Sequence, residues 1–396
     1  MRISAFIFII ISMYQSVKAV QPEQIDTIID QISYTLYIEN KSAKVISGKE
    51  CKGEITIPRI IEYRDIQFKV EEINNCAFKD NRYLTKISIP SSVNYIGYQA
   101  FFNCRYMKEI DLCSSCIPTI EYAVFSFCER LKSIKLPNTI KDIGASAFSH
   151  CQELTSIYIP QSIENIYSAA FDDCRKLKEV YFVDIADWCK VKLEGYGTSP
   201  FIGGNADLYV DSVLVTDLII PNGASRISTF EGCGSIQSIT IPQSIGYIYG
   251  FSHCPNLAKI TLEGNSTINY NAFQYLPNLI EVNCLTSIPP ELESIIYAGG
   301  IEVNAFYNSY PEYMTLHVPV GTKEVYENTY GWKDFGTIID DLPNNSGLDE
   351  VSIDNTKPID VYNMNGVCIF SGIYQQDLPS GIYIIKQGTR SKTIIK

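Results

Sequence analysis

The chain has 396 residues, of which 46% are hydrophobic, and it carries a formal net charge of −12. This hydrophobic content excludes a disordered chain, and an acidic protein is a poor partner for nucleic acid or anionic lipid. The length allows one large core or two domains.

Residues 1–19 have the layout of a secretory signal peptide. Arg2 precedes an apolar run from Ile3 to Met13, and Val17-Lys18-Ala19 places small or apolar residues before a cleavage point. The run is shorter than the roughly 20 apolar residues that span a membrane, and no later stretch is long and apolar enough. The sequence therefore predicts an exported protein with no membrane span in the mature chain.

Residues 20–83 are predicted to form an N-terminal β cap that includes a first partial repeat. The stretch ISYTLYIENKSAKVISG alternates like a β-hairpin, and ITIP resembles the strand of the later repeats. Ala77 and Phe78 belong to INNCAF, which contains the first copy of a recurring Ala-Phe pair.

From Leu84 onward the chain repeats itself, beginning with LTKISIPSSVNYIGYQAFFNCRY. Further repeats start at Met107, Leu131, Leu154, Leu177, Ile236, Leu257 and Leu279. A period of about 20–29 residues with an L-x-x-I-x-I core is typical of a leucine-rich-repeat solenoid, a β-rich fold in which each coil packs only on its neighbours. Strand alternation predicts that Leu84, Ile87 and Ile89 face inward and that Lys86 and Ser88 face outward.

A cysteine recurs at one position of the coil, which we call the cysteine rung. Its members are Cys104, Cys128, Cys151, Cys174, Cys233 and Cys254. Asn81 and Leu276 take this place in other coils, so we predict a buried position that needs a small or apolar residue, with the thiols reduced. The pair His150-Cys151, followed by Asp172, Asp173 and Cys174, has the composition of a metal site or a nucleophile with its base, but the repeat favours packing.

The repeat is interrupted between Leu177 and Ser235. Residues 183–206 are predicted to be an irregular insertion, and LYVDSVLVTDLIIP is predicted to be a hairpin that returns to the strand position. The solenoid is predicted to extend over residues 84–340. Its C-terminal cap should contain a helix at about 323–330, with Trp332 and Phe335 covering the last coil.

Beyond the solenoid, residues 341–353 read as a polar linker and residues 354–396 as a small β domain of short strands with Asn-Gly and Ser-Gly turns.

The coil L-x-x-I-x-I-P, I-x-x-I, A-F-x-x-C resembles the BspA-like leucine-rich repeat over roughly residues 45–300, and HVPVGTKEVYENTYGWKDFGTIID is similar to a terminal segment of that family. The resemblance implies a secreted or surface-exposed bacterial protein, and several members of the family are adhesins.

The tail is similar to the C-terminal sorting domain of type IX secretion. The matching residues are Val361, Tyr362, Asn363, Met364, Asn365, Gly366, Leu378, Pro379, Ser380, Gly381, Ile382, Tyr383 and the basic end from Lys392 to Lys396. This second resemblance implies a secretion machinery as partner and the outer surface of a Gram-negative bacterium as destination. A simple C-terminal β cap is the alternative.

Motifs of catalysis are missing from the sequence, which has no G-x-S-x-G elbow, H-E-x-x-H, phosphate-binding loop or dinucleotide fingerprint. The three histidines are His150, His253 and His317, and the first two are expected on the packing rung. We expect neither a metal nor a cofactor. The exception is Cys113-Ser114-Ser115-Cys116, because a C-x-x-C pair can support thiol-redox chemistry when it opens a helix. Ile117-Pro118 follows this pair, so no helix is predicted there.

The strands of such a solenoid line a concave face whose outward side chains are free to vary. On this face we predict the ligand-binding residues Lys86, Glu109, Asp111, Lys135, Tyr158, Glu179 and Tyr181. Tyr158 and Tyr181 should be neighbours on adjacent coils, with Glu179 beside them, and tyrosine suits recognition. The general preference of strands for tyrosine is an equally good explanation of the pair.

The predicted function is a non-catalytic binding or adhesion module for an extracellular protein or glycan. The alternatives are a structural cell-surface component without a dedicated ligand, and a thiol-redox enzyme that uses Cys113 and Cys116.

Overall fold

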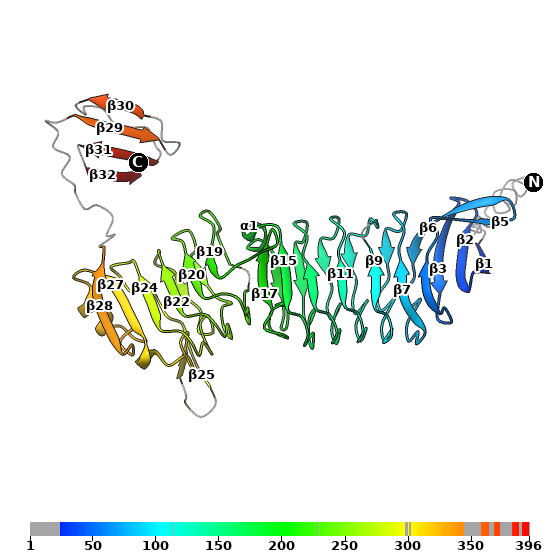
Figure 1. Ribbon diagram of the computed structural model, residues 1–396, viewed down its shortest axis with the longest axis horizontal. Helices are drawn as coiled ribbons and strands as arrows, with labels where there is room; N and C mark the ends of the chain where they lie inside the picture. Colours follow the sequence, from blue (N-terminus) through cyan, green and yellow to red (C-terminus); the bar gives the residue numbers. More distant parts are fainter. Residues whose placement is uncertain are drawn as a thin grey trace, which may run out of the picture.

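The computed structural model describes residues 24–112, 114–227, 229–297, 300, 302–343, 358–363, 368–372, 382–387 and 390–395. The predicted signal peptide, residue 113 and most of the predicted linker lie outside these ranges. The chain folds as the predicted β-solenoid, an elongated stack of coils in which parallel strands lie side by side (Figure 1).

The N-terminal cap is a sheet with the strand order β1-β2-β3-β6-β5. Its strands are β1 (Gln24–Ile29), β2 (Ile32–Tyr37), β3 (Ser42–Ser47), β5 (Ile60–Tyr63) and β6 (Ile66–Ile73), and β8 (Tyr95–Ile96) joins it at β6. Strands β2 and β3 are antiparallel, which confirms the predicted hairpin. Because β6 and β8 pair in parallel, this sheet leads directly into the solenoid.

The main face of the solenoid carries two sheets. The first contains β4 (Gly53–Thr56), β7 (Leu84–Ser88), β9 (Glu109–Asp111), β11 (Ser133–Lys135), β13 (Ser156–Tyr158), β15 (Glu179–Phe182), β17 (Asp207–Val210) and β18 (Val213–Leu214). The second contains β19 (Asp217–Ile219), β20 (Ser238–Ile241), β22 (Lys259–Leu262), β24 (Glu281–Cys284), β27 (Thr315–Pro319) and β28 (Thr337–Leu342). All neighbours pair in parallel except β17 and β18. Strands β18 and β19 end their sheets, and we call the break between them the seam.

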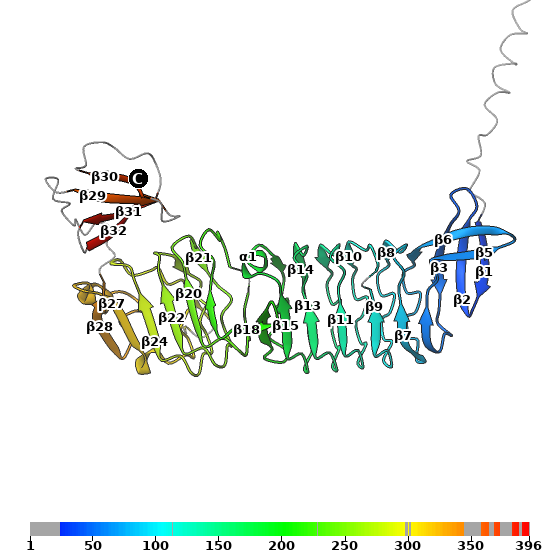
Figure 2. The ribbon, with the colours of Figure 1, turned by 45° about the horizontal axis from the view of Figure 1, so that its top comes forward.

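A second, shorter ladder runs along another side of the coils (Figure 2). It contains β10 (Thr119–Ile120), β12 (Asp142–Ile143), β14 (Asn165–Tyr167) and β16 (Lys192–Glu194), and beyond the seam β21 (Tyr247–Ile248) pairs with β23 (Thr267–Ile268). The segment predicted as an irregular insertion thus still supplies a ladder strand, β16. It also contains helix α1 (Ile185–Trp188), and the buried Trp188 ring lies 4.5 Å from that of Phe182.

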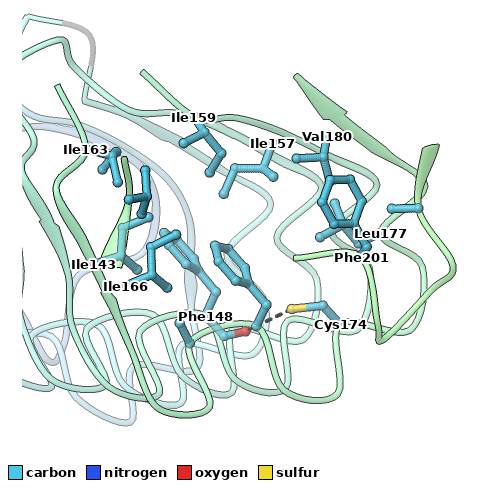
Figure 3. Close-up of a cluster of buried hydrophobic side chains, with 14 of the residues drawn as sticks. Ile143, Phe148, Ile157, Ile159, Ile163, Ile166, Cys174, Leu177, Val180 and Phe201 are labelled. Carbon is cyan, nitrogen blue, oxygen red and sulfur yellow. Dashed lines mark hydrogen bonds between the residues drawn. The ribbon is translucent and has the colours of Figure 1, made fainter. Parts of the chain in front are cut away.

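The core is a stack of identical contacts repeated from coil to coil. Phe78 and Phe101 have ring centroids 5.0 Å apart, and the series continues through Phe125, Phe148 and Phe171 at 5.5–5.7 Å. Figure 3 shows how isoleucine, leucine and phenylalanine side chains of successive coils fill this interior.

The predicted inward residues Leu84, Ile87 and Ile89 are buried, which confirms the alternation read from the sequence. Since each side chain packs on its equivalent one coil away, the coils stabilise one another.

The array ends as predicted, under aromatic side chains. Trp332 and Phe335 lie 5.8 Å and 5.2 Å from the ring of Phe306. The short helices are η2 (Pro311–Tyr313) and α2 (Lys323–Glu327), so α2 begins where it was predicted and is shorter than expected. A two-stranded hairpin, β25 (Ser294–Ile296) and β26 (Glu302–Asn304), projects from the side of the last coils (Figure 1).

A separate antiparallel sheet with the order β30-β29-β31-β32 lies within the predicted C-terminal domain. Its strands are β29 (Ile359–Asn363), β30 (Cys368–Gly372), β31 (Ile382–Gln387) and β32 (Arg390–Ile395). None of the helices in the described ranges is long and apolar enough to cross a membrane.

Candidate ligand-binding face

The six cysteines of the rung are all buried, as predicted, but they are not mere apolar fillers. The thiol of Cys151 donates a hydrogen bond to the carbonyl of Phe125 at 3.2 Å, and that of Cys174 donates to Phe148 at 3.2 Å (Figure 3). Cys104, Cys128 and Cys254 donate to the equivalent phenylalanine carbonyls. In the last coil, Ser309 takes the same place and donates to Phe273 at 2.6 Å.

The predicted requirement for a small or apolar residue therefore needs correction. Asn81, at the start of the rung, also donates to two backbone carbonyls, those of Gly48 and Cys51. Most occupants are hydrogen-bond donors to the preceding coil. Leu276 and Cys233 are exceptions, and the thiol of Cys233 contacts the hydroxyl of Ser235 at 3.7 Å. A donor is useful because the carbonyl it reaches is buried and has capacity for a second hydrogen bond.

Burial also makes these thiols unreactive. Desolvation raises the pKa of Cys104 and Cys174 to about 12 and that of Cys233 to about 11. A thiol that stays protonated at physiological pH is a poor nucleophile and a poor metal ligand. The twelve described cysteines are all free.

His150 and Cys151 point to different surroundings. His150 has a left-handed backbone with φ of 60°, and its side chain is 33% exposed. Its Nδ1 lies 2.8 Å from Oδ2 of Asp173, and its ring stacks on Phe127 at 4.3 Å. His253 is likewise half-exposed, so the prediction that both histidines lie on the packing rung is wrong. They lie one residue before it, where the left-handed backbone turns the side chain outward.

Asp173 is held as a carboxylate by its neighbours. Although desolvation acts in the opposite direction, hydrogen bonds from Arg175, His150 and Gln152 lower the pKa of Asp173 to about 2. These hydrogen bonds of Asp173 link two neighbouring coils, and they do not bring a nucleophile next to a base. Within the described ranges, no three His, Cys, Asp or Glu side chains converge as metal ligands would.

The C-x-x-C pair is described only at its second member. Cys116 is exposed and free, Cys113 lies outside the described residues, and no helix begins at residues 114–118. The helix that would lower the pKa of a redox-active thiol is therefore not formed by those residues.

The main face brings three tyrosines together in one row. Tyr158 and Tyr181 are paired in register on β13 and β15, and their rings stack at 4.3 Å with an angle of 7°. Tyr209 on β17 continues the row, 4.8 Å from Tyr181. Lys135 on β11 precedes it, with its Nζ 5.8 Å from the centre of the Tyr158 ring. We call Tyr158, Tyr181 and Tyr209 the tyrosine row.

An acidic row runs beside the tyrosine row. Glu179 accepts a hydrogen bond of 3.0 Å from the Tyr181 hydroxyl, and Asp207 is the neighbour of Glu179 on the next strand. Desolvation and this hydrogen bond raise the pKa of Tyr181 to about 12. The hydroxyl therefore stays neutral and fixes the orientation of the ring.

The other predicted ligand-binding residues lie on the same face, two or more coils from the tyrosine pair. Lys86 and Glu109 form an ion pair of 2.8 Å between β7 and β9, and Asp111 is in register with Lys135. The structure therefore separates an ion-paired region from an aromatic one. The sequence analysis did not include Tyr209 among the ligand-binding residues, because it follows the interrupted coil. Its place in LYVDSVLV, at the start of the predicted hairpin, could have indicated that it lies on the same face.

The predicted secretion-signal residues lie in or around the C-terminal sheet. Val361 is buried in β29, Tyr362 and Asn363 belong to the same strand, and Tyr383 belongs to β31. Asn365, Gly366, Gly381 and Lys396 lie outside the described residues.

The model of the BspA type leucine-rich repeat region matches this chain in six copies, over residues 60–184 and 206–333, which is more than half of its length. No curated protein matches the sequence.

Several solved structures are similar to the chain. A leucine-rich repeat protein from Bacteroides ovatus is 24% identical over 66% of this chain and 76% of its own, with a TM-score of 0.34. A leucine rich cell surface protein from Faecalibacterium prausnitzii is 19% identical over 82% of this chain and 99% of its own, with a TM-score of 0.40. The pneumococcal vaccine antigen PcpA is 20% identical over 81% of this chain and 99% of its own, with a TM-score of 0.36.

Proposed function

Because this chain belongs to the BspA-type leucine-rich-repeat family, we propose that it is a non-catalytic binding or adhesion protein of the bacterial cell surface. It recognises an extracellular protein or glycan through its main face. The observation that carries the proposal is the tyrosine row, with Lys135 at one end and Glu179 beside it. Core positions of a repeat are constrained by packing, whereas these outward positions are not.

The tyrosine row has the features of a recognition surface. The Tyr158 side chain is 44% exposed, and stacking limits the movement of the rings before any ligand arrives. Stiff aromatic residues bury a large area at a low cost in side-chain entropy, and they are enriched among the residues that dominate binding energy.

A binding screen of the whole chain against extracellular-matrix proteins and mucin glycans tests the proposal. The variant Tyr158→Ala/Tyr181→Ala should lose the hits, with a drop in affinity of at least about tenfold, since single hot-spot residues contribute 2 kcal/mol or more. The matched control is Tyr98→Ala/Tyr122→Ala, which removes two exposed tyrosines of adjacent coils beside the shorter ladder.

Equal loss in both variants would indicate a general effect on folding, and hits kept in the Tyr158/Tyr181 variant would place the site elsewhere. Absence of any hit would contradict a binding function and favour a structural surface component.

We propose separately that the C-terminal unit directs export by type IX secretion to the surface of a Gram-negative bacterium. The support is the likeness of VYNMNG and GIY to the sorting motif together with the four-stranded antiparallel sheet. Expression in a bacterium with this pathway, with and without residues 354–396, tests it. Retention of the shortened chain inside the cell is expected, and equal export of both chains would contradict the proposal.

A further inference from the structure

The seam leaves two strand edges without a partner in the part of the chain that the structure describes. Strand β18 pairs only with β17, and β19 pairs only with β20. The carbonyl of Thr216 accepts from Ser238 at 3.1 Å, and the amide of Ile220 donates to Thr240 at 3.0 Å. Both partners belong to the β20 side.

Alternate residues of a strand direct their backbone groups to opposite neighbours. Since residues 216 and 220 bond toward β20, Asp217 and Ile219 direct their N–H and C=O groups toward the seam. Such an edge is a template on which another extended chain can pair.

Apolar side chains surround this edge and continue the tyrosine row. Val213 is 67% exposed, Leu214 is 45% exposed and Ile219 is 68% exposed. Leu214 is in register with Tyr209, so the apolar surface begins where the tyrosine row ends. The turn of this hairpin consists of two residues, Asp211 and Ser212. Both have positive φ, as a tight two-residue turn requires.

The tyrosine row itself is poorly suited to stacking against a sugar ring. Each ring lies 4.3–4.8 Å from the next in a nearly parallel stack, so the ring faces between them are covered. Lys135 lies over Tyr158 at the outer end. Apart from the face of Tyr209 that points away from Tyr181, a ligand meets a line of ring edges and hydroxyl groups, which suits the side chains of an extended polypeptide.

Carboxylates border the seam on both sides. Asp211, in the turn between β17 and β18, and Asp217, on β19, lie at the seam, whereas Asp207 on β17 and Glu179 on β15 lie one and two strands away from β18. Among the described residues none of the four forms an ion pair, although Asp217 accepts hydrogen bonds from Ser238 and Thr216. A ligand with basic side chains complements this border.

We propose that the seam accepts an extended polypeptide with alternating basic and apolar side chains. Its main chain pairs with the edge of β19, its apolar side chains pack on Val213, Leu214 and Ile219, and its basic side chains face the carboxylates. This is recognition by strand addition, in which the main chain supplies affinity and alternate side chains supply specificity. The inference rests on the proposed function. It narrows the class of ligand from a protein or glycan to an extended polypeptide segment with basic side chains.

The test uses the whole chain and a fluorescein-labelled peptide of alternating lysine and valine, measured by anisotropy at physiological salt. Two companion peptides isolate the two contributions. One has N-methyl groups on alternate residues, which remove main-chain donors, and the other has glutamate in place of lysine. The lysine peptide should bind, and both companions should bind at least tenfold more weakly.

Ile219→Lys should weaken the lysine peptide at least tenfold, because it places a positive charge and a longer side chain at the edge. Ile280→Lys is the matched control, since Ile280 is 63% exposed and lies away from the seam. Amide hydrogen exchange at residues 217–219 should slow when the peptide is added, which detects pairing without any substitution.

Equal binding of the N-methylated peptide, or unchanged exchange at residues 217–219, would overturn strand pairing. Equal binding of the glutamate peptide would overturn the charge argument. Failure of the lysine peptide to bind, while the surface screen still gives hits that need Tyr158 and Tyr181, would overturn this inference and leave the proposed function standing.

Discussion

Substitution of Cys151 distinguishes a donor rung from an apolar one. The side chain is fully buried and its thiol lies 3.2 Å from the Phe125 carbonyl, which also accepts the amide of Cys128 at 3.1 Å. Cys151→Ala leaves that carbonyl paired, so no unsatisfied group arises. It loses the burial of the sulfur, about 1 kcal/mol if sulfur is counted as roughly one methylene, and leaves a void that costs about 0.5 kcal/mol more.

Cys151→Ser loses the same apolar burial but keeps a hydrogen-bond donor. Ser309 shows that a serine hydroxyl can donate from the equivalent position of another coil. A net hydrogen bond contributes about 1 kcal/mol, which the alanine variant loses and the serine variant keeps. Counting burial, void and hydrogen bond, we expect the alanine variant to lose about 2.5 kcal/mol and the serine variant, with similar burial and void losses, about 1.5 kcal/mol. The difference of about 1 kcal/mol corresponds to roughly a fivefold difference in the opening of this coil.

Hydrogen exchange of the amides in residues 125–151 is the suitable assay, because long repeat arrays do not unfold as one unit and local opening is the relevant quantity. Ser309→Cys is the reciprocal control and should be nearly neutral. If the alanine variant opens no more readily than the serine variant, the thiol acts only as an apolar filler, and the donor account is wrong.

Three further predictions concern titration and reactivity. Because desolvation raises the pKa of Cys104 and Cys174 from 9.0 to about 12, the stability they support is complete below pH 9 and lost as the pH rises toward 12. Alkaline unfolding followed by circular dichroism should show this loss, and a flat profile up to pH 12 would contradict it. A thiol reagent should modify Cys116 and Cys368 before Cys151 in the native protein, as read by mass spectrometry, and equal rates would refute the burial argument. Asp173 has a pKa lowered from 3.8 to about 2, so its contribution is complete above pH 3.8 and falls toward pH 2. Asp173→Asn should make the melting temperature depend less steeply on pH between about pH 2 and pH 3.8. An unchanged dependence on pH would contradict this and would show that other carboxylates dominate.

The repeat made much of the fold predictable, because a solenoid converts a sequence interval into a spatial contact. Tyr158 and Tyr181 are 23 positions apart in the sequence and become ring neighbours, as do the phenylalanines of the core. The alternation within LTKISIP likewise determined which side chains are buried. These features depend only on the period and on strand geometry.

Other features depend on backbone groups that a side-chain pattern does not reveal. For five of the six rung cysteines the acceptor is a carbonyl of the preceding coil, so the sequence shows the cysteine without its partner. His150 turns outward because its backbone is left-handed, and the repeat alone gave no sign of that conformation. Tyr209 joins the tyrosine row only because the chain returns to the strand position after residues 183–206, an interval that breaks the period.

The seam follows from the same geometry that makes the rest of the solenoid regular. In an unbroken parallel ladder every strand has its main chain paired on both sides, so a ligand meets only side chains. The hairpin of β17 and β18 reverses the chain for one strand, and a reversed strand cannot continue the parallel stack. Stacking restarts at β19, which leaves main-chain donors and acceptors facing the break. We therefore propose that recognition through the backbone takes place at the seam and recognition through side chains along the tyrosine row. The register of Leu214 with Tyr209 makes the two surfaces continuous.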